Sequence, residues 1–245
     1  MDVSKFLAFR WSEGALENIE HPDLVKRENL IAIDKQISTI IKNTRAFVNG
    51  NHFLNMLLWG ERGSGKSSVV KMLLETFKDK GLRVIEIDKE SAFSIYPLYK
   101  KIRCLPEYRF LLFFDDISFD AQDDTYRRFK SIIEGGIEQT PKNVMFVATS
   151  NKRHLIKEHA LNTQDIYSRD EINEQLSLFG RFGLIVGFPP FSKEEYLSIV
   201  KYYLERMGIE MNKEIEKEAE AYAMERASRS GRVAKQFAIY KSIFR

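Results

Sequence analysis

An eight-residue loop, GERGSGKS at residues 60–67, brings three glycines, a lysine and two serines together in a spacing suited to phosphate. Glycines allow successive backbone N–H groups to turn inward around an anion, because they carry no side chain that would block its approach. In the pattern G-x-x-x-x-G-K-[S/T], the lysine contacts the β- and γ-phosphates and the hydroxyl contacts Mg²⁺. We therefore predict a nucleoside triphosphate site. The residues predicted to surround the nucleotide are Gly60, Glu61, Arg62, Gly63, Ser64, Gly65, Lys66, Ser67 and Ser68.

Two adjacent carboxylates, Asp115 and Asp116, follow the apolar run FLLFF at residues 110–114. Such a run predicts a buried strand, and a strand beside a phosphate loop commonly ends in the aspartate that holds the Mg²⁺ shell. We assign that metal role to Asp115, together with Ser67, and we expect Asp116 to orient or deprotonate the attacking water. The alternative is structural, with one aspartate capping a helix and the other exposed in a turn.

A second apolar run, VMFVA at residues 144–148, ends in Thr149, Ser150 and Asn151. In open α/β folds, ligands bind at the carboxyl edge of the sheet, so these polar groups are expected near the phosphate loop. Asn151 is the candidate for a hydrogen bond to the water or to the γ-phosphate, although an asparagine at a strand end is also common in a plain turn. The basic residues 152–154 are expected to be solvated or to lie at an interface.

The elements that must position these groups alternate between strands and helices. Helical spacing of apolar residues predicts helices over residues 28–48, 66–80, 94–103 and 122–134. Apolar runs predict strands over residues 53–59, 82–88, 110–116, 143–151 and 184–188. This alternation indicates an α/β fold with a five-stranded parallel sheet flanked by helices.

The pattern changes after Pro189 and Pro190. Ser192 and Glu195 form an S-x-x-E capping box, and helical spacing continues from there almost to the end of the chain. We therefore expect three parts: an N-terminal extension over residues 1–27, an α/β domain over 28–190, and a small all-helical unit over 191–245.

Composition sets broad limits on the function. The 245 residues include 38 basic and 35 acidic side chains, and the resulting net charge of +3 is too small to indicate nucleic acid by itself. A single cysteine excludes an internal disulfide. No segment of the sequence is apolar enough for a secretion signal or a membrane helix, so we expect a cytoplasmic protein without a membrane partner.

The phosphate loop, the acidic strand, the polar-ended strand and the helical C-terminal unit, in that order, resemble the AAA+ ATPases. The segments FFDDISF, ATSNKRHLI, RFGL and SRSGRVAKQF look like a bacterial branch of that superfamily that is catalogued only as a domain of unknown function. The resemblance implies a P-loop NTPase fold with a helical C-terminal lid, and it implies ATP and Mg²⁺ as cofactors.

The same resemblance assigns roles to individual residues. Lys66 and Ser67 match the Walker A pair, Asp115 and Asp116 the Walker B pair, and Asn151 the sensor-1 position.

Two arginines complete the set of roles that the resemblance implies. Arg181 looks like an arginine finger that acts in trans on a neighbouring subunit, which implies a homo-oligomer. Arg232 looks like sensor 2, with Arg229 as its rival. For each, a surface position without a catalytic role is the alternative.

One departure from the family pattern bears on the activity. Most AAA+ proteins have Asp-Glu where this chain has Asp115-Asp116, so water positioning is expected to be looser and turnover slower. The bacterial replication initiators also carry Asp-Asp-Ile there, which keeps hydrolysis plausible and gives a DNA-associated role some weight. Residues 226–245 contain six basic side chains and no acidic ones, which suits either a nucleic-acid surface or a lid that faces ATP.

Three functions remain open from the sequence. The first is an oligomeric ATPase that remodels an unknown partner, and the second is a nucleotide-gated, DNA-associated module with slow hydrolysis. The third, a small-molecule kinase, would need an acceptor pocket in place of the finger and the lid. Adenine is favoured over guanine because NKRH, at residues 151–154, has a histidine where GTP-binding families have an acid. We expect adenine to lie between residues 30–34 and the lid.

Overall fold

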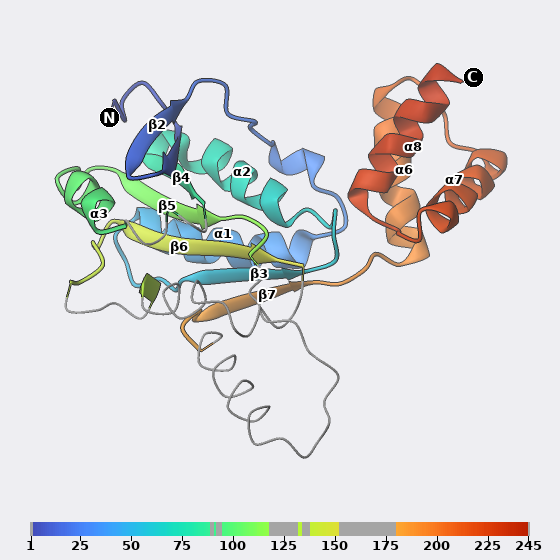
Figure 1. The fold of residues 1–245 in the computed structure, drawn as a ribbon. Coiled ribbons are helices and arrows are strands. Elements are labelled where there is room, and N and C mark those ends of the chain that lie inside the picture. Colours follow the sequence, from blue (N-terminus) through green and yellow to red (C-terminus); the bar gives the residue numbers. More distant parts are fainter. Residues whose placement is uncertain are drawn as a thin grey trace, which may run out of the picture.

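The computed structural model describes residues 2–88, 91, 95–117, 132–133, 138–151 and 180–244. Its centre is a seven-stranded sheet (Figure 1). The strands are Ala8–Ser12 (β1), Ala15–Ile19 (β2), Met56–Gly60 (β3), Leu82–Ile87 (β4), Arg109–Phe114 (β5), Val144–Ser150 (β6) and Leu184–Phe188 (β7). Their order across the sheet is β2-β1-β4-β5-β6-β3-β7. The α/β class is therefore confirmed. Strands β3, β4, β5, β6 and β7 are parallel and overlap the predicted runs, with β3 and β5 each extending one residue beyond them.

The expected number of five strands is wrong, because the first 27 residues add two more. Strand β1 pairs parallel with β4 and antiparallel with β2, so the sheet is mixed. Phe9 and Trp11 are fully buried, whereas Arg10 between them is exposed and forms a 2.9 Å ion pair with Glu86 of β4. A five-residue strand with arginine and serine in it carries too few apolar residues to stand out in the sequence.

Helices cover both faces of the sheet. On one face, α1 (Asp34–Val48) and α2 (Lys66–Phe77) share a hydrophobic cluster with side chains such as Leu58. On the other face, α3 (Ile95–Arg103) packs in a second cluster with side chains such as Leu57. Short 3-10 helices span Arg27–Asn29 (η1) and Lys78–Lys80 (η2). The helix expected over residues 122–134 lies outside the described residues, apart from helical residues 132 and 133.

Three helices follow β7: α6 (Lys193–Arg206), α7 (Lys213–Glu225) and α8 (Gly231–Ile243). Figure 1 shows them beside the end of the sheet at which β3 runs into α2. The predicted capping box is confirmed, since Ser192 N–H donates to Glu195 Oε2 at 2.8 Å and Glu195 N–H donates to Ser192 Oγ at 3.2 Å. No helix among the described residues has the length and apolar character needed to cross a bilayer.

Trp11 provides a test of whether the N-terminal strands belong to the folded core. Its side chain is fully buried, so Trp11→Ala should lower the free energy of unfolding by about 3–5 kcal/mol, measured by urea denaturation. Glu17→Ala, on the exposed edge strand β2, should change it by no more than about 0.5 kcal/mol. Equal, small effects of both substitutions would show that β1 does not contribute to the core.

Candidate functional site

The loop between β3 and α2 requires glycine at two positions where the backbone approaches other elements. Gly60 has φ +140°, and a Cβ there would lie 1.9 Å from the carbonyl oxygen of Phe188 at the end of β7. Gly65 has φ +100° and lies directly before the first turn of α2. A side chain at Gly60 would separate β3 from β7, and the left-handed φ of Gly65 is strained for any other residue. The glycines thus hold the loop against the sheet edge.

Lys66 is the charged group at the centre of the loop, and its side chain is buried. Its ammonium donates hydrogen bonds to the carbonyl oxygens of Gly60 and Glu61, both at 2.8 Å, and to Asn151 Oδ1 at 3.1 Å. Burial lowers the pKa of Lys66, while the nearby carboxylates of Asp116 and Asp115 act in the opposite direction. The ammonium is therefore held by neutral oxygens that a phosphate can replace.

Asp115 lies opposite the start of α2. Its Oδ1 accepts hydrogen bonds from Ser67 Oγ at 2.7 Å and from Thr149 Oγ1 at 2.6 Å. A hydroxyl and a carboxylate oxygen are hard donors of the kind that Mg²⁺ uses when phosphates supply further ligands. These residues therefore fit the predicted metal, which Ser67 and Asp115 would hold.

Asp116 takes a backbone conformation that is unusual for an aspartate, with φ +49°. Its N–H donates to Thr149 Oγ1 at 2.8 Å, and its Oδ1 accepts a hydrogen bond from Asn151 Nδ2. Arg62 lies 4.0 Å from its other oxygen, but both side chains are exposed, so this ion pair contributes little. Asn151 thus connects Asp116 with Lys66, and the three predicted polar groups lie together.

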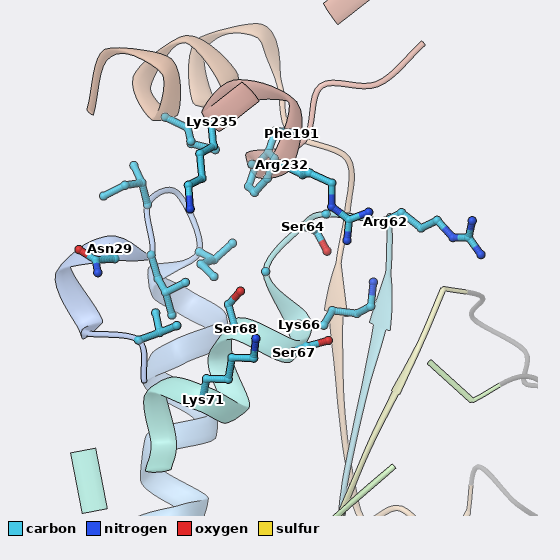
Figure 2. Close-up of a pocket in the computed structure, with 18 of the residues that line it drawn as sticks. Asn29, Arg62, Ser64, Lys66, Ser67, Ser68, Lys71, Phe191, Arg232 and Lys235 are labelled. Carbon is cyan, nitrogen blue, oxygen red and sulfur yellow. The ribbon is translucent and has the colours of Figure 1, made fainter. Parts of the chain in front are cut away.

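A cavity of about 1010 Å³ opens beside this cluster, between the α/β part and the C-terminal helices (Figure 2). Its lining includes all the predicted loop residues from Arg62 to Ser68, together with Asp115, Asp116 and Asn151. The apolar part of the wall comes from Leu30, Ile31, Ile33, Phe191, Ile199 and Met207. The cavity therefore combines polar and charged groups of the phosphate loop with apolar side chains that can contact a flat group.

The first turn of α8 faces the phosphate loop. Gly231 N–H donates to the carbonyl oxygen of Gly63 at 3.0 Å, and Ser230 Oγ caps the helix by accepting from Val233 N–H at 3.3 Å. Arg232, in this turn, lines the cavity, and Figure 2 shows its guanidinium extending toward the loop near Ser64.

The rival arginine, Arg229, is placed differently from Arg232. It does not line the cavity, and its Nη2 lies 3.9 Å from Glu220 of α7. Of the two candidates, Arg232 therefore has the position from which a guanidinium can reach a bound phosphate.

Several lining residues were not identified from the sequence. Asn29 Oδ1 accepts hydrogen bonds from Tyr202 Oη at 2.6 Å and from Arg206 Nη1 at 3.0 Å, which ties η1 to α6 at the rim of the cavity. Figure 2 shows Lys71 and Lys235 pointing into the cavity from α2 and α8. The i, i+4 spacing of Tyr202 and Arg206 places both on one face of a helix, but it is a weak indication of a binding site, because solvated helix faces show the same spacing equally often.

Arg181 lies away from the cavity of its own chain. It is exposed in the turn before β7, whereas Phe188 at the other end of β7 contacts the loop. Five strand residues separate the two ends of β7 by roughly 13 Å. Arg181 is therefore poorly placed to contact the loop of its own chain.

The chain resembles known proteins in sequence and in fold. The family described as "Protein of unknown function (DUF815)" matches residues 4–242. Among curated proteins, the ORC1-type DNA replication protein 14 of Haloarcula marismortui is 32% identical over 63 residues, which are 25% of this chain and 15% of that protein.

Solved structures of low sequence identity share the fold. The RuvB Holliday junction branch migration motor of Thermotoga maritima has a TM-score of 0.56 at 15% identity, covering 87% of this chain and 62% of that chain. The Aeropyrum pernix ORC1 protein in complex with DNA has a TM-score of 0.60 at 15% identity, covering 89% and 63%. The chain thus spans about three fifths of these two proteins.

A third solved structure, the HORMA:CdnC:Trip13 complex of E. coli MS115-1, has a TM-score of 0.57 at 10% identity, covering 87% of this chain and 89% of that chain. The predicted resemblance to the AAA+ fold, within a branch of unknown function, is confirmed.

Two glycine substitutions separate the effect of backbone strain from that of close approach. Gly14→Ala, at φ +79° with open space around it, should cost about 1–2 kcal/mol. Gly60→Ala should cost at least about 2 kcal/mol more, because its Cβ would overlap Phe188. Thermal unfolding of both variants measures the difference. Equal melting temperatures would contradict the contact between β3 and β7.

Proposed function

The chain belongs to the family described as "Protein of unknown function (DUF815)", and we propose that it is an AAA+ ATPase that binds and hydrolyses ATP with Mg²⁺. The observation that carries the proposal is the meeting of Lys66, Ser67, Asp115 and Asn151 at one cavity. Lys66 and Ser67 belong to the first turn of α2, whereas Asp115 and Asn151 directly follow the adjacent strands β5 and β6. A turn that is rich in glycine by chance would have no reason to lie beside the Asp115 carboxylate and to be followed by a buried lysine.

The residues divide the work of hydrolysis between them. Lys66 exchanges its carbonyl partners for the β- and γ-phosphates and offsets their charge. Asp116, steadied by Asn151, orients the water that adds to the γ-phosphorus while the bond to the ADP oxygen breaks. Ser67 and Asp115 would hold Mg²⁺, which would offset phosphate charge. Since aspartate is one methylene shorter than glutamate, we expect slow turnover.

The apolar residues in the cavity lining support adenine as the base. Leu30 and Ile31 lie on the α/β side, and Phe191, Ile199 and Met207 lie on the helical side. A flat base held between these walls would contact both parts of the chain. The domain boundaries at residues 27 and 190, and the role of residues 191–245 as a lid, are part of this proposal.

The position of Arg181 supports a homo-oligomer. Its distance from the loop of its own chain supports action on the γ-phosphate of a neighbouring subunit, as an arginine finger. Arg232 is then the sensor-2 arginine in the same chain as the nucleotide. We propose that the assembly uses hydrolysis to remodel a partner, which is either a protein or DNA.

A DNA-associated module with slow hydrolysis is the second candidate, and the similarity to ORC1 proteins favours it. The basic C-terminal segment gives it less support than its charge suggests. Arg232 and Lys235 line the cavity, while Lys241 pairs with Glu218 at 2.6 Å and Arg229 lies 3.9 Å from Glu220. Most of these cations therefore already have a role within the chain.

Lys66→Ala tests the nucleotide site. Loss of the ammonium should weaken Mg·ATP binding at least about 100-fold, which corresponds to about 3 kcal/mol, measured by isothermal titration calorimetry. Lys42→Ala, on the exposed side of α1, is the matched control and should bind as the wild type does. Unchanged affinity in Lys66→Ala, or no binding by the wild type, would refute the proposal.

Arg181→Ala tests the oligomer. We expect steady-state turnover that rises with protein concentration in the wild type and falls by about 10³-fold or more in the variant, as for other arginine fingers. Mixing Arg181→Ala with Lys66→Ala should restore part of the activity, because the second variant supplies Arg181 to the intact site of the first. No recovery, or DNA-stimulated turnover that survives Arg181→Ala, would favour the DNA-associated candidate.

A further inference from the structure

One hydroxyl group contacts both aspartates of the acidic pair. Thr149, at the carboxyl end of β6, has a side chain that is 1% exposed. Its Oγ1 donates to Asp115 Oδ1 at 2.6 Å and accepts from Asp116 N–H at 2.8 Å. A single atom on the neighbouring strand therefore connects the carboxylate of one aspartate with the backbone of the next.

The direction of these two hydrogen bonds is fixed. A hydroxyl has one hydrogen to donate, and the backbone N–H of Asp116 can only be a donor. Thr149 Oγ1 must therefore accept from Asp116, which leaves its own hydrogen for the carboxylate of Asp115. The direction of one hydrogen bond therefore determines the direction of the other, because only one assignment of donors and acceptors satisfies both.

The contact with Asp116 falls where the backbone is strained. Asp116 has φ +49°, a region that costs a residue with a side chain on the order of 1–3 kcal/mol unless its surroundings hold it there. The hydrogen bond from its N–H to Thr149 is one such restraint, and the bond from Ile117 N–H to the Thr149 carbonyl at 2.8 Å is another. The first needs the hydroxyl, whereas the second needs only the backbone.

We propose that Thr149 is a positioning residue that sets both carboxylates of the site. It holds Asp115 Oδ1 in place, so that the carboxylate would be set for the metal, and it holds Asp116 in the backbone conformation that directs its carboxylate toward Asn151. When Ser67 turns to the metal, Thr149 remains as the donor that fixes Asp115. This inference rests on the proposed Mg²⁺-dependent ATPase function and names how the site is set up for the metal.

Thr149→Val removes the hydroxyl with almost no change of shape, and Thr149→Ser keeps the hydroxyl while removing a methyl group. Partners that orient metal ligands typically change metal affinity or activity by 10–100-fold. We therefore expect the Mg²⁺ concentration for half-maximal turnover to rise about 10–100-fold in Thr149→Val and to return close to the wild-type value in Thr149→Ser. Binding of Mn²⁺ in the presence of ADP, followed by electron paramagnetic resonance, should weaken in the same order.

A control separates the metal from the nucleotide. Affinity for ATP measured in EDTA should be the same in the wild type and in both variants, because Lys66 and the loop are untouched. A purely structural role would lower the melting temperature of Thr149→Val and leave the dependence on Mg²⁺ unchanged, which would overturn the inference. If Thr149→Val does not fold, Thr149→Ala removes the same hydroxyl without adding volume and replaces it in each comparison.

The failure of this inference is distinguishable from that of the proposed function. A wild-type protein that binds no ATP and no Mn²⁺·ADP refutes the ATPase itself. A wild type that binds both, with Thr149→Val indistinguishable from it in Mn²⁺ affinity, refutes only the role of Thr149.

Discussion

A buried ammonium group determines how the rest of the site is arranged. Lys66 has little access to solvent, so its charge must be satisfied by hydrogen bonds within the chain. Two of its acceptors are loop carbonyls, and the third is Asn151 at the end of β6. Strand β6 must therefore lie next to β3, as it does in the sheet. That neighbour relation also brings Thr149 and the acidic pair of β5 within reach of α2.

Local signals made part of this arrangement predictable. The loop from Gly60 to Ser67 and the capping box at Ser192 are defined by residues close together in sequence, and the five apolar runs are long enough to stand out. Strand β1 did not stand out, since its stability comes from pairing with β4, more than 70 residues away. The same limit applies to Asn29, which meets Tyr202 only because η1 and α6 pack together.

The roles of the polar strand ends were only partly readable for a related reason. Sequence shows that Thr149, Ser150 and Asn151 end a strand, but the order of strands in the sheet decides which of them faces the acidic pair. Asn151 contacts Lys66 and Asp116, whereas Thr149 contacts Asp115 and the backbone of Asp116. Thr149 and Asn151 thus contact different groups although they end the same strand, and their spacing in the sequence alone does not show which residue contacts which group.

The hydrogen bond from Gly231 N–H to the carbonyl of Gly63 joins α8 to the turn that would cradle phosphate. Both groups belong to the main chain, so no side-chain rotation can absorb a shift of either partner. A displacement of the turn must break this bond or carry the first turn of α8 with it. Because α6, α7 and α8 pack against one another, such a shift would move the three helices together. A ligand that shifts the turn when it binds in the cavity would in this way also move the C-terminal helices at the periphery of the molecule.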